Sequence, residues 1–243
     1  MTIQVYEVGG CVRDELLGVK TNDVDLLLVG APSFESGVAH AKGMGLFPIP
    51  GTFRPEFATF KASVPKEHRL RERCKAVDFV LSRKDGFHGD GRRPDSTEPG
   101  TLEDDLRRRD FTINSLAKDL VTGEIIDMFD GQRDLRRREL RFVGEPLDRI
   151  REDGLRVLRG FRFSITKGMT LIPTDPTALA LQSGLAVEML GKVSVERIRE
   201  EVEKMFKHDT VESLALFTTL SQEMRLAIFR NGLRLSATLK SVR

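Results

Sequence analysis

The sequence has few cysteines, little net charge and no long apolar run. The scarcity of cysteine and the absence of a long apolar run each exclude a class of protein. Its two cysteines, Cys11 and Cys74, lie far apart and outside any C-x-x-C pattern. This excludes a disulfide framework and a structural zinc site. The longest apolar runs, such as residues 26–29, are far shorter than a membrane span, and the first residues lack a basic segment followed by an apolar one. We therefore expect a cytoplasmic protein.

Charged residues are abundant but nearly balanced. Lysine and arginine total 39 against 37 acidic residues in a chain of 243, so the formal net charge is only +2. The imbalance is local, because residues 133–162 contain ten arginines, no lysine and six acidic residues. Arginine makes bidentate contacts with phosphates and base edges, so this stretch indicates a nucleotide or nucleic-acid partner. A solvated helix face with ion pairs would give the same composition.

The arrangement of apolar residues divides the chain into two parts. At roughly 150 residues per domain, one or two domains are expected. Strands are predicted at residues 24–29, 57–64 and 77–81, and Thr122-Gly123 is predicted to be a hairpin turn leading into residues 124–128. After residue 141 the pattern predicts helices over 150–165 and 195–206, with Ser194 as an N-cap, and a helical tail over 212–229. A mixed part is therefore followed by an all-helical part.

A pair of glycines and a pair of aspartates stand out near the N-terminus. Gly9 and Gly10 precede a short helix predicted over 13–17, and their bare N–H groups suit a triphosphate. Asp23 and Asp25 alternate along the next predicted strand, so their side chains point to the same side. Neighbouring carboxylates raise each other's pKa unless a cation lies between them, which favours a Mg²⁺ site. An Asp-x-Asp pair taken alone is more often a surface feature.

A third acidic residue lies within an apolar run. Asp78 is flanked by Val77 and Phe79, whose side chains point to the opposite face of the predicted strand. A two-metal site needs another acidic ligand, and Asp78 is the candidate. A cross-strand or edge-strand role is the alternative.

A series of motifs runs along nearly the whole chain: the run Gly9-Gly-Cys-Val-Arg-Asp14, the pair Asp23 and Asp25, and residues 104–114 (DDLRRRDFTIN), 130–135 (DGQRDL), 152–163 (EDGLRVLRGFRF) and 196–201 (ERIREE). In this order they resemble the motifs of the bacterial-type (class II) tRNA nucleotidyltransferase and poly(A) polymerase family. The resemblance implies an α+β fold with a polymerase-β-like nucleotidyltransferase head over residues 1–140. It also implies an all-helical, base-selecting neck over 141–207 and a short helical remnant of a body domain over 208–243.

The resemblance also implies a site for the incoming nucleotide. Guanidinium groups beside an acid suit ribose hydroxyls and phosphate oxygens, although a solvated basic run is the usual explanation of consecutive arginines. The residues assigned to nucleotide binding are Gly9, Gly10, Arg13, Arg108, Arg109, Asp110, Asn114, Arg159 and Arg162. Residues 82–100 are expected to form a mobile loop near this site, because they are rich in Gly, Pro, Asp and Arg and too long for a tight turn. In the family, the equivalent loop helps the change from C to A addition.

Three charged residues of the helix predicted over 150–165 are candidates for reading the base. Glu152, Asp153 and Arg156 would share one face of that helix, opposite its apolar residues. A carboxylate accepts a hydrogen bond from the exocyclic amine of cytosine or adenine, and a guanidinium donates to the adjacent ring nitrogen. Uracil and guanine present a carbonyl oxygen instead. The resemblance implies that Asp153 and Arg156 select the base while Glu152 holds the arginine; an ordinary ion-pair cluster is the alternative.

Together these features predict a Mg²⁺-dependent enzyme that adds C and A from CTP and ATP to the 3′ end of tRNA and releases pyrophosphate. Asp23, Asp25 and Asp78 would be its catalytic metal ligands. The alternatives are a poly(A) polymerase, an enzyme that adds only CC or only A, and a noncatalytic RNA- or nucleotide-binding protein on the same scaffold.

The chain departs from the family pattern in several places. Gly154 stands where the family often has Pro, Ser115 where it often has Ala, and Asp78 where Glu is more frequent. The helical body and tail domains that hold tRNA in the family have little counterpart in this sequence. We therefore expect tRNA binding that is weak or that depends on a homo-oligomer.

Overall fold

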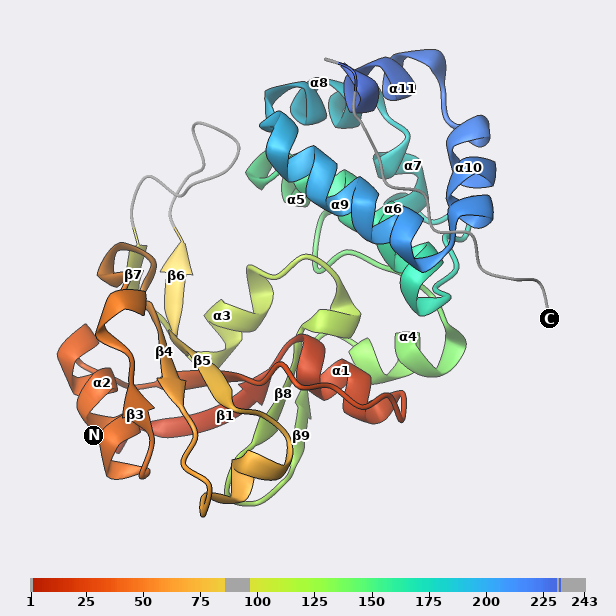
Figure 1. Ribbon diagram of the computed structural model, residues 1–243. Helices are drawn as coiled ribbons and strands as arrows, with labels where there is room; N and C mark the ends of the chain where they lie inside the picture. The colour runs from red at the N-terminus through yellow and green to blue at the C-terminus, as the bar shows by residue number, and fades with distance from the viewer. Residues whose placement is uncertain (1, 86–96, 231, 233–243) are drawn as a thin grey trace. The chain divides into compact units, whose positions relative to one another are not determined.

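The computed structural model describes residues 2–85, 97–230 and 232, which divide into two compact units (Figure 1). The head unit comprises the described residues up to Leu135, and the helical unit begins at Arg136. Helix α4 (Gly131–Arg137) carries the chain from the first unit into the second.

The head unit is built on a seven-stranded mixed sheet with strand order β3-β4-β5-β2-β1-β8-β9. Its strands are β1 (Gln4–Val8), β2 (Asp25–Val29), β3 (Phe47–Pro48), β4 (Thr59–Ser63), β5 (Ala76–Leu81), β8 (Leu116–Asp119) and β9 (Ile125–Asp127). Neighbouring strands are antiparallel except β2 and β5, which are parallel. A second, two-stranded sheet pairs β6 (Arg83–Asp85) with β7 (Thr97–Pro99). The helices are α1 (Gly10–Leu16), α2 (Phe34–Gly43) and α3 (Leu102–Arg107), with single-turn 3-10 helices η1 (Pro50–Thr52), η2 (Pro55–Phe57), η3 (Arg69–Glu72) and η4 (Thr112–Asn114).

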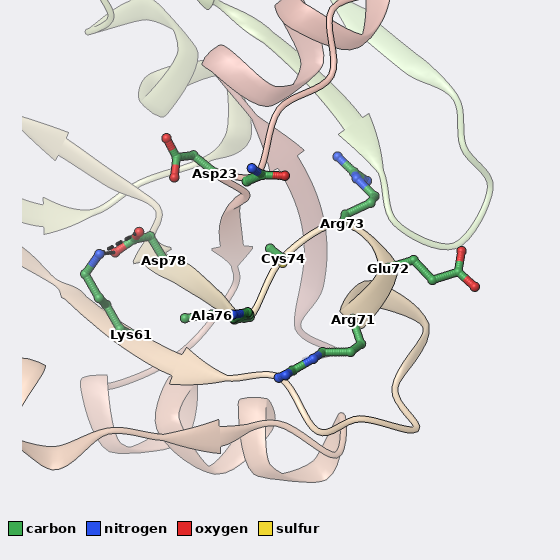
Figure 2. Close-up of a pocket in the computed structure, with 10 residues that line it drawn as sticks. Asp23, Lys61, Arg71, Glu72, Arg73, Cys74, Ala76 and Asp78 are labelled. Carbon is green, nitrogen blue, oxygen red and sulfur yellow. Dashed lines mark hydrogen bonds and ion pairs between the residues drawn. The ribbon is translucent and has the colours of Figure 1, made fainter.

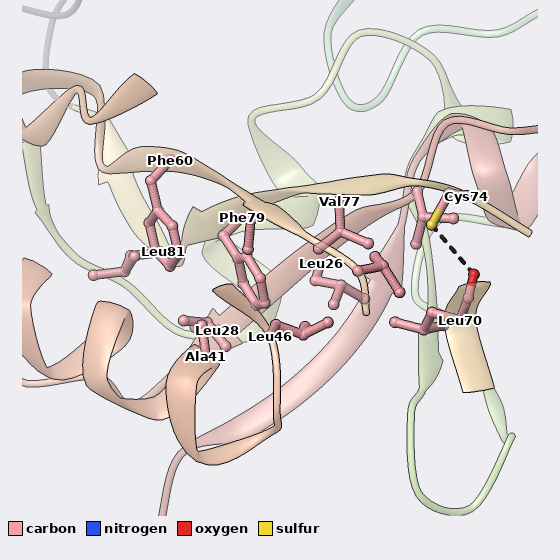
Figure 3. Close-up of a cluster of buried hydrophobic side chains, with 13 residues drawn as sticks. Leu26, Leu28, Ala41, Leu46, Phe60, Leu70, Cys74, Val77, Phe79 and Leu81 are labelled. Atoms are coloured by element: carbon pink, nitrogen blue, oxygen red, sulfur yellow. Dashed lines mark hydrogen bonds between the residues drawn. The ribbon is translucent and has the colours of Figure 1, made fainter. Parts of the chain in front are cut away.

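Different helices cover the two faces of the sheet, because apolar side chains alternate along its strands. On one face, Leu26 and Phe79 belong to a buried cluster that includes Ala41 of α2 (Figure 3). On the opposite face, Leu27 lies in a second cluster with Leu106 of α3. Helix α3 therefore packs on the face to which the odd-numbered residues of β2 point.

The helical unit consists of α5 (Pro146–Glu152), α6 (Leu155–Lys167), α7 (Pro176–Leu181), α8 (Gly184–Lys192), α9 (Val195–His208), α10 (Thr210–Thr219) and α11 (Gln222–Phe229). Helices α6 and α9 lie side by side (Figure 1), and each buries an apolar stripe that includes Phe161 on α6 and Val202 on α9. Strand-type pairing among the described residues of this unit is limited to one bridge between Glu139 and Thr170. Over the described ranges, no helix has the length and apolar character needed to span a membrane.

The fold class predicted from the sequence is confirmed, since a mixed-sheet head with helices precedes an all-helical region. The strands predicted at 24–29, 57–64 and 77–81 are β2, β4 and β5, and Gly123, with a φ of +76°, lies in the predicted turn between β8 and β9. The helix predicted over 13–17 begins earlier, at Gly10. The helical tail predicted over 212–229 is confirmed and consists of α10 and α11, with Ser221 as the N-cap of α11. The domain boundaries at 140 and 207 stay predictions.

The prediction of a continuous helix over 150–165 is wrong. The chain leaves helical geometry at Asp153, whose φ is −154° and ψ 108°, and α6 begins only at Leu155. The Asp153 carboxylate accepts a hydrogen bond of 3.0 Å from the N–H of Leu155, which would otherwise have no partner at the start of the helix. This local hydrogen bond stabilises the break, so Glu152, Asp153 and Arg156 do not lie on one face of a single helix.

Candidate active site

The two predicted metal-binding segments meet at one edge of the head sheet. Strands β2 and β5 both begin at this edge, and their parallel pairing makes Asp25 and Asp78 register partners. Both residues have the same parity as Leu27 and Val80, which face the cluster under α3. Carboxylates from distant parts of the chain are thereby placed side by side on one face.

Asp23 continues the alternation just before β2 begins. It is exposed, whereas the intervening Val24 is buried and Asp25 is partly buried. Burial raises the pKa of Asp25, and the negative charges of Asp78 and Asp23 raise it further against the opposing charge of Arg109. A carboxylate whose ionised form is disfavoured in this way gains most from a bound cation.

Asp78 is paired with a lysine from the neighbouring strand. Lys61 of β4 is its cross-strand partner, and the Lys61 ammonium lies 2.9 Å from each carboxylate oxygen (Figure 2). Val77 and Phe79 are buried in the opposite face, so the predicted alternation is confirmed. Within the described residues, no three acidic, histidine or cysteine side chains are close enough together to hold a metal ion as they stand. The oxygen donors suit a hard divalent cation, and holding it with all three aspartates requires a local rearrangement of side chains.

Gly9 turns the chain from β1 into α1 at the same edge. Its φ is +73°, and a Cβ atom at this position would lie 2.8 Å from Nη1 of Arg109. Any other residue would be strained here and would push the guanidinium away. The structure therefore brings together Gly9 and Arg109, both assigned to the nucleotide, with Gly10 as the first residue of α1.

Three more of the residues assigned to the nucleotide form one buried hydrogen-bonded chain. The Arg13 guanidinium donates to the side-chain oxygen of Asn114 and pairs with Asp14 at 2.8 Å. The Asn114 amide in turn donates to Asp110 over 2.9 Å, and Asp110 also accepts from the N–H of Phe111. Arg13, Asn114 and Asp110 are all buried, so this network fixes the positions of groups at the edge of the site.

One acidic residue that organises the arginines was missed as a site residue in the sequence. Asp105 of α3 is fully buried, and each of its oxygens faces one guanidinium, Arg108 on Oδ1 and Arg109 on Oδ2. Burial alone would raise the pKa of Asp105, but the charges and hydrogen bonds of Arg109 and Arg108 outweigh it and hold that pKa below its ordinary value. The signal was available, because Asp105 lies three and four residues before the two arginines, the spacing at which side chains on a helix meet.

The base-reading candidates lie in the helical unit. The Glu152 carboxylate accepts hydrogen bonds from Arg149 and, at 2.6 Å, from Arg156. The geometry therefore brings Glu152 and Arg156 into the contact that the resemblance implies. Asp153 is held differently: Arg197 of α9 binds both of its oxygens, at 3.2 and 2.7 Å. Sequence reasoning missed Arg197, because no local spacing links α9 to the turn before α6.

Arg159 and Arg162, assigned to phosphates, lie on α6 of the same unit. Both guanidinium carbons are above the ring of Phe163, at 5.4 and 4.2 Å from its centroid. Arg162 also donates a 2.5 Å hydrogen bond to Glu201 of α9, which is buried. Burial would raise the pKa of Glu201, but the charge of Arg162 and a hydrogen bond from Lys204 lower it. The role of the two arginines in binding phosphate stays a prediction.

Two departures from the family pattern have a physical reason in this chain. A Cβ atom on Gly154 would lie 2.3 Å from the carbonyl oxygen of Met189, so α8 approaches the turn too closely for a side chain. The Ser115 hydroxyl donates to the carbonyl of Leu106 over 2.7 Å in a fully buried position. The mobile loop expected over 82–100 lies largely outside the described residues, and its described ends are β6 and β7.

Comparisons with known proteins agree with the family resemblance of the sequence motifs. A family model for the poly A polymerase head domain matches residues 5–141. The CCA-adding enzyme of Oceanobacillus iheyensis is 34% identical over 234 residues, a match that covers 93% of this chain and 52% of that enzyme. The chain therefore spans about half the length of such relatives.

Solved structures give the same result. The crystal structure of the Bacillus stearothermophilus CCA-adding enzyme in complex with CTP is 31% identical, with a TM-score of 0.72 over 94% of this chain and 54% of that one. A tRNA nucleotidyltransferase complexed with a primer tRNA and an incoming ATP analog is 28% identical, with a TM-score of 0.72 over 96% of this chain and 60% of that one.

Proposed function

Because the chain belongs to the nucleotidyltransferase family of CCA-adding enzymes with a poly A polymerase head domain, we propose that it adds C and A from CTP and ATP to the 3′ end of tRNA without a nucleic-acid template. The observation that carries this proposal is the register pairing of Asp25 with Asp78 beside arginines held by Asp105. A site that only binds nucleotides has no need to gather carboxylates of like charge, since their repulsion costs stability unless a cation joins them.

In the proposed reaction, Asp23, Asp25 and Asp78 would hold Mg²⁺, and the bound cation would lower the pKa of the RNA 3′-hydroxyl and neutralise charge on the triphosphate. The hydroxyl oxygen attacks the α-phosphorus in line as its proton passes to solvent water, the bond to the bridging oxygen of the β-phosphate breaks, and pyrophosphate leaves. Arg108 and Arg109, fixed by Asp105, orient the nucleotide and stabilise the charge that develops on it.

Base choice is assigned to the helical unit. The Asp153 carboxylate would accept a hydrogen bond from the amine of cytosine or adenine, and the Arg156 guanidinium would donate to the ring nitrogen. Glu152 and Arg197 are the positioning residues, because their contacts hold Arg156 and Asp153 respectively. UTP and GTP would leave the Asp153 carboxylate facing a carbonyl oxygen, an unfavourable pairing of two acceptors.

The test is incorporation into a labelled tRNA that lacks its 3′ CCA, with Mg²⁺ and with CTP, ATP, both, or UTP and GTP. Products sized at single-nucleotide resolution should show two additions with CTP, three with both, and none with UTP or GTP. Asp23→Asn and Asp25→Asn should lose turnover while retaining the circular dichroism of the wild type. Asp119→Asn serves as a matched control, because Asp119 is on β8 and its carboxylate accepts hydrogen bonds from the N–H groups of Val121 and Thr122 in the turn that follows.

Each alternative has its own outcome. A long ladder with ATP alone would indicate a poly(A) polymerase, and products that stop after CC or contain a single A would indicate a partial activity. RNA binding without any product in any mixture would favour a noncatalytic protein. Retention of most turnover by either aspartate variant would contradict the metal assignment.

A further inference from the structure

We propose that a hollow on the β4–β5 side of the carboxylates binds the phosphate backbone of the last nucleotides at the RNA 3′ end. This inference rests on the proposed function and specifies where the second substrate lies. The hollow has a volume of about 480 Å³ and opens where β2 and β5 begin (Figure 2). Its walls include Asp23 and Asp78, so a strand lying in it passes directly beside the metal-binding carboxylates.

The order of strands along the edge separates the two substrates. From one side to the other, the edge carries the end of β4, the starts of β5 and β2, the end of β1 and the start of β8. The groups assigned to the nucleotide, such as Gly9 and Asn114, adjoin β1 and β8. None of them lines the hollow, which adjoins β4 and β5. The carboxylates lie between, as they must if the 3′-hydroxyl and the α-phosphate approach from opposite sides for in-line attack.

The walls of the hollow carry cations that are available to a polyanion. Lys75 is exposed, and no contact among the described residues engages its ammonium. The guanidinium of Arg71 makes one described hydrogen bond, to the carbonyl of Val64 at 2.8 Å, which leaves further N–H groups for a ligand. Arg73 pairs with the buried Glu7 and adds a third positive group at the wall. This surface suits phosphates, which arginine and lysine bind as charged acceptors.

The side chains that line the hollow favour contacts with the phosphate backbone of the RNA over contacts with its bases. The described residues that line the hollow are Asn22, Asp23, Lys61, Arg71, Glu72, Arg73, Cys74, Lys75, Ala76 and Asp78, and none of these has an aromatic ring on which a base could stack. Phosphate contacts fix position and carry no sequence information. A hollow of this kind can therefore hold the 3′ end of every tRNA in the same place.

A smaller hollow of about 300 Å³ continues the path. It is lined in part by Gly51, Arg54 and Thr59, and it shares Lys61 and Asp78 with the first. The ion pair of Lys61 with Asp78 therefore lies between the two hollows.

The test uses the full chain and a fluorescently labelled tRNA lacking its 3′ CCA. The variants are Lys75→Gln and the double variant Arg71→Gln/Lys75→Gln, and the matched controls are Lys66→Gln and Arg69→Gln. Lys66 and Arg69 are exposed residues of the same connection between β4 and β5, and neither lines the hollow. Arg69 also donates to a backbone carbonyl, so it reproduces the bonding of Arg71.

Anisotropy in EDTA should show weaker RNA binding by the double variant, about tenfold at moderate salt, and a salt dependence whose slope falls by about 1.4. In the turnover assay the KM for tRNA should rise while the KM for CTP stays at the wild-type value. The proposal is overturned if Lys75→Gln and the double variant match the controls, or if the KM for CTP rises in place of that for tRNA. Lys75→Gln alone decides the matter if loss of the Arg71 bond to Val64 unfolds the double variant. If the wild type binds tRNA but makes no product, the proposed function fails, and the binding measurement still decides this inference.

Discussion

Replacing Asp105 tests how strongly the head unit depends on one buried carboxylate. Asp105 is 0% exposed, and its two oxygens accept hydrogen bonds from Arg108 and Arg109, whose side chains are 22% and 18% exposed. Asp105→Ala would leave two largely buried guanidinium groups without their shared counter-charge. Breaking a buried ion pair from one side costs about 3–5 kcal/mol, a large part of the 5–15 kcal/mol by which a typical domain is stable. Asp105→Asn keeps one acceptor and should cost less, about 1.5–3 kcal/mol.

The assay is urea unfolding followed by far-UV circular dichroism, with Glu103→Ala as the control. Glu103 is on the same helix and also pairs with an arginine, but both side chains of that pair are more than half exposed. An exposed pair contributes at most about 1 kcal/mol. A loss from Asp105→Ala no larger than that from Glu103→Ala would refute the reasoning.

The Asp105 prediction also has a pH signature. Because the folded state holds the pKa of Asp105 below its ordinary value, its contribution to stability is present above about pH 4 and is lost as the pH falls through the folded pKa. The stability difference between wild type and Asp105→Ala should therefore shrink in acid. In the turnover assay the same variants should raise the KM for CTP, since Arg108 and Arg109 lose their fixed positions.

Three further changes have defined outcomes. Asp25→Asn removes a carboxylate whose pKa is raised by burial and like charges, and a group of that kind costs stability above its ordinary pKa. This variant should therefore melt at a higher temperature than wild type at pH 7 in EDTA, while losing turnover. A lower melting temperature would contradict the electrostatic account. Arg197→Met frees Asp153, and misincorporation of UTP in single-turnover assays should rise, whereas unchanged base discrimination would remove Arg197 from the positioning role. Gly154→Ala places a methyl group against the carbonyl of Met189, and thermal melts should show a loss of about 1–3 kcal/mol; a stable variant would mean that α8 can shift.

The sequence predicted the strands that carry the site, but it did not predict how those strands pair. Alternation of apolar residues identified the strands that hold Asp25 and Asp78, because that signal is local. Their pairing in parallel register depends on the order of strands in the whole sheet, which periodicity does not report. For the same reason the contact between Arg197 and Asp153 had no sequence signal. The apolar pattern of 150–165 continues across the break at Asp153, so it concealed the hydrogen bond by which Asp153 ends one helix and begins the next.

The parallel ladder between β2 and β5 links the alignment of the site to the packing of the core. A shift of one residue between these strands would turn Asp25 and Asp78 to opposite faces of the sheet, and it would pull a leucine or phenylalanine out of the core in the same movement. Correct alignment of the carboxylates and a complete core therefore depend on one set of backbone hydrogen bonds. A chain that misaligned the site would lose core packing as well, and its exposed backbone would be open to proteolysis.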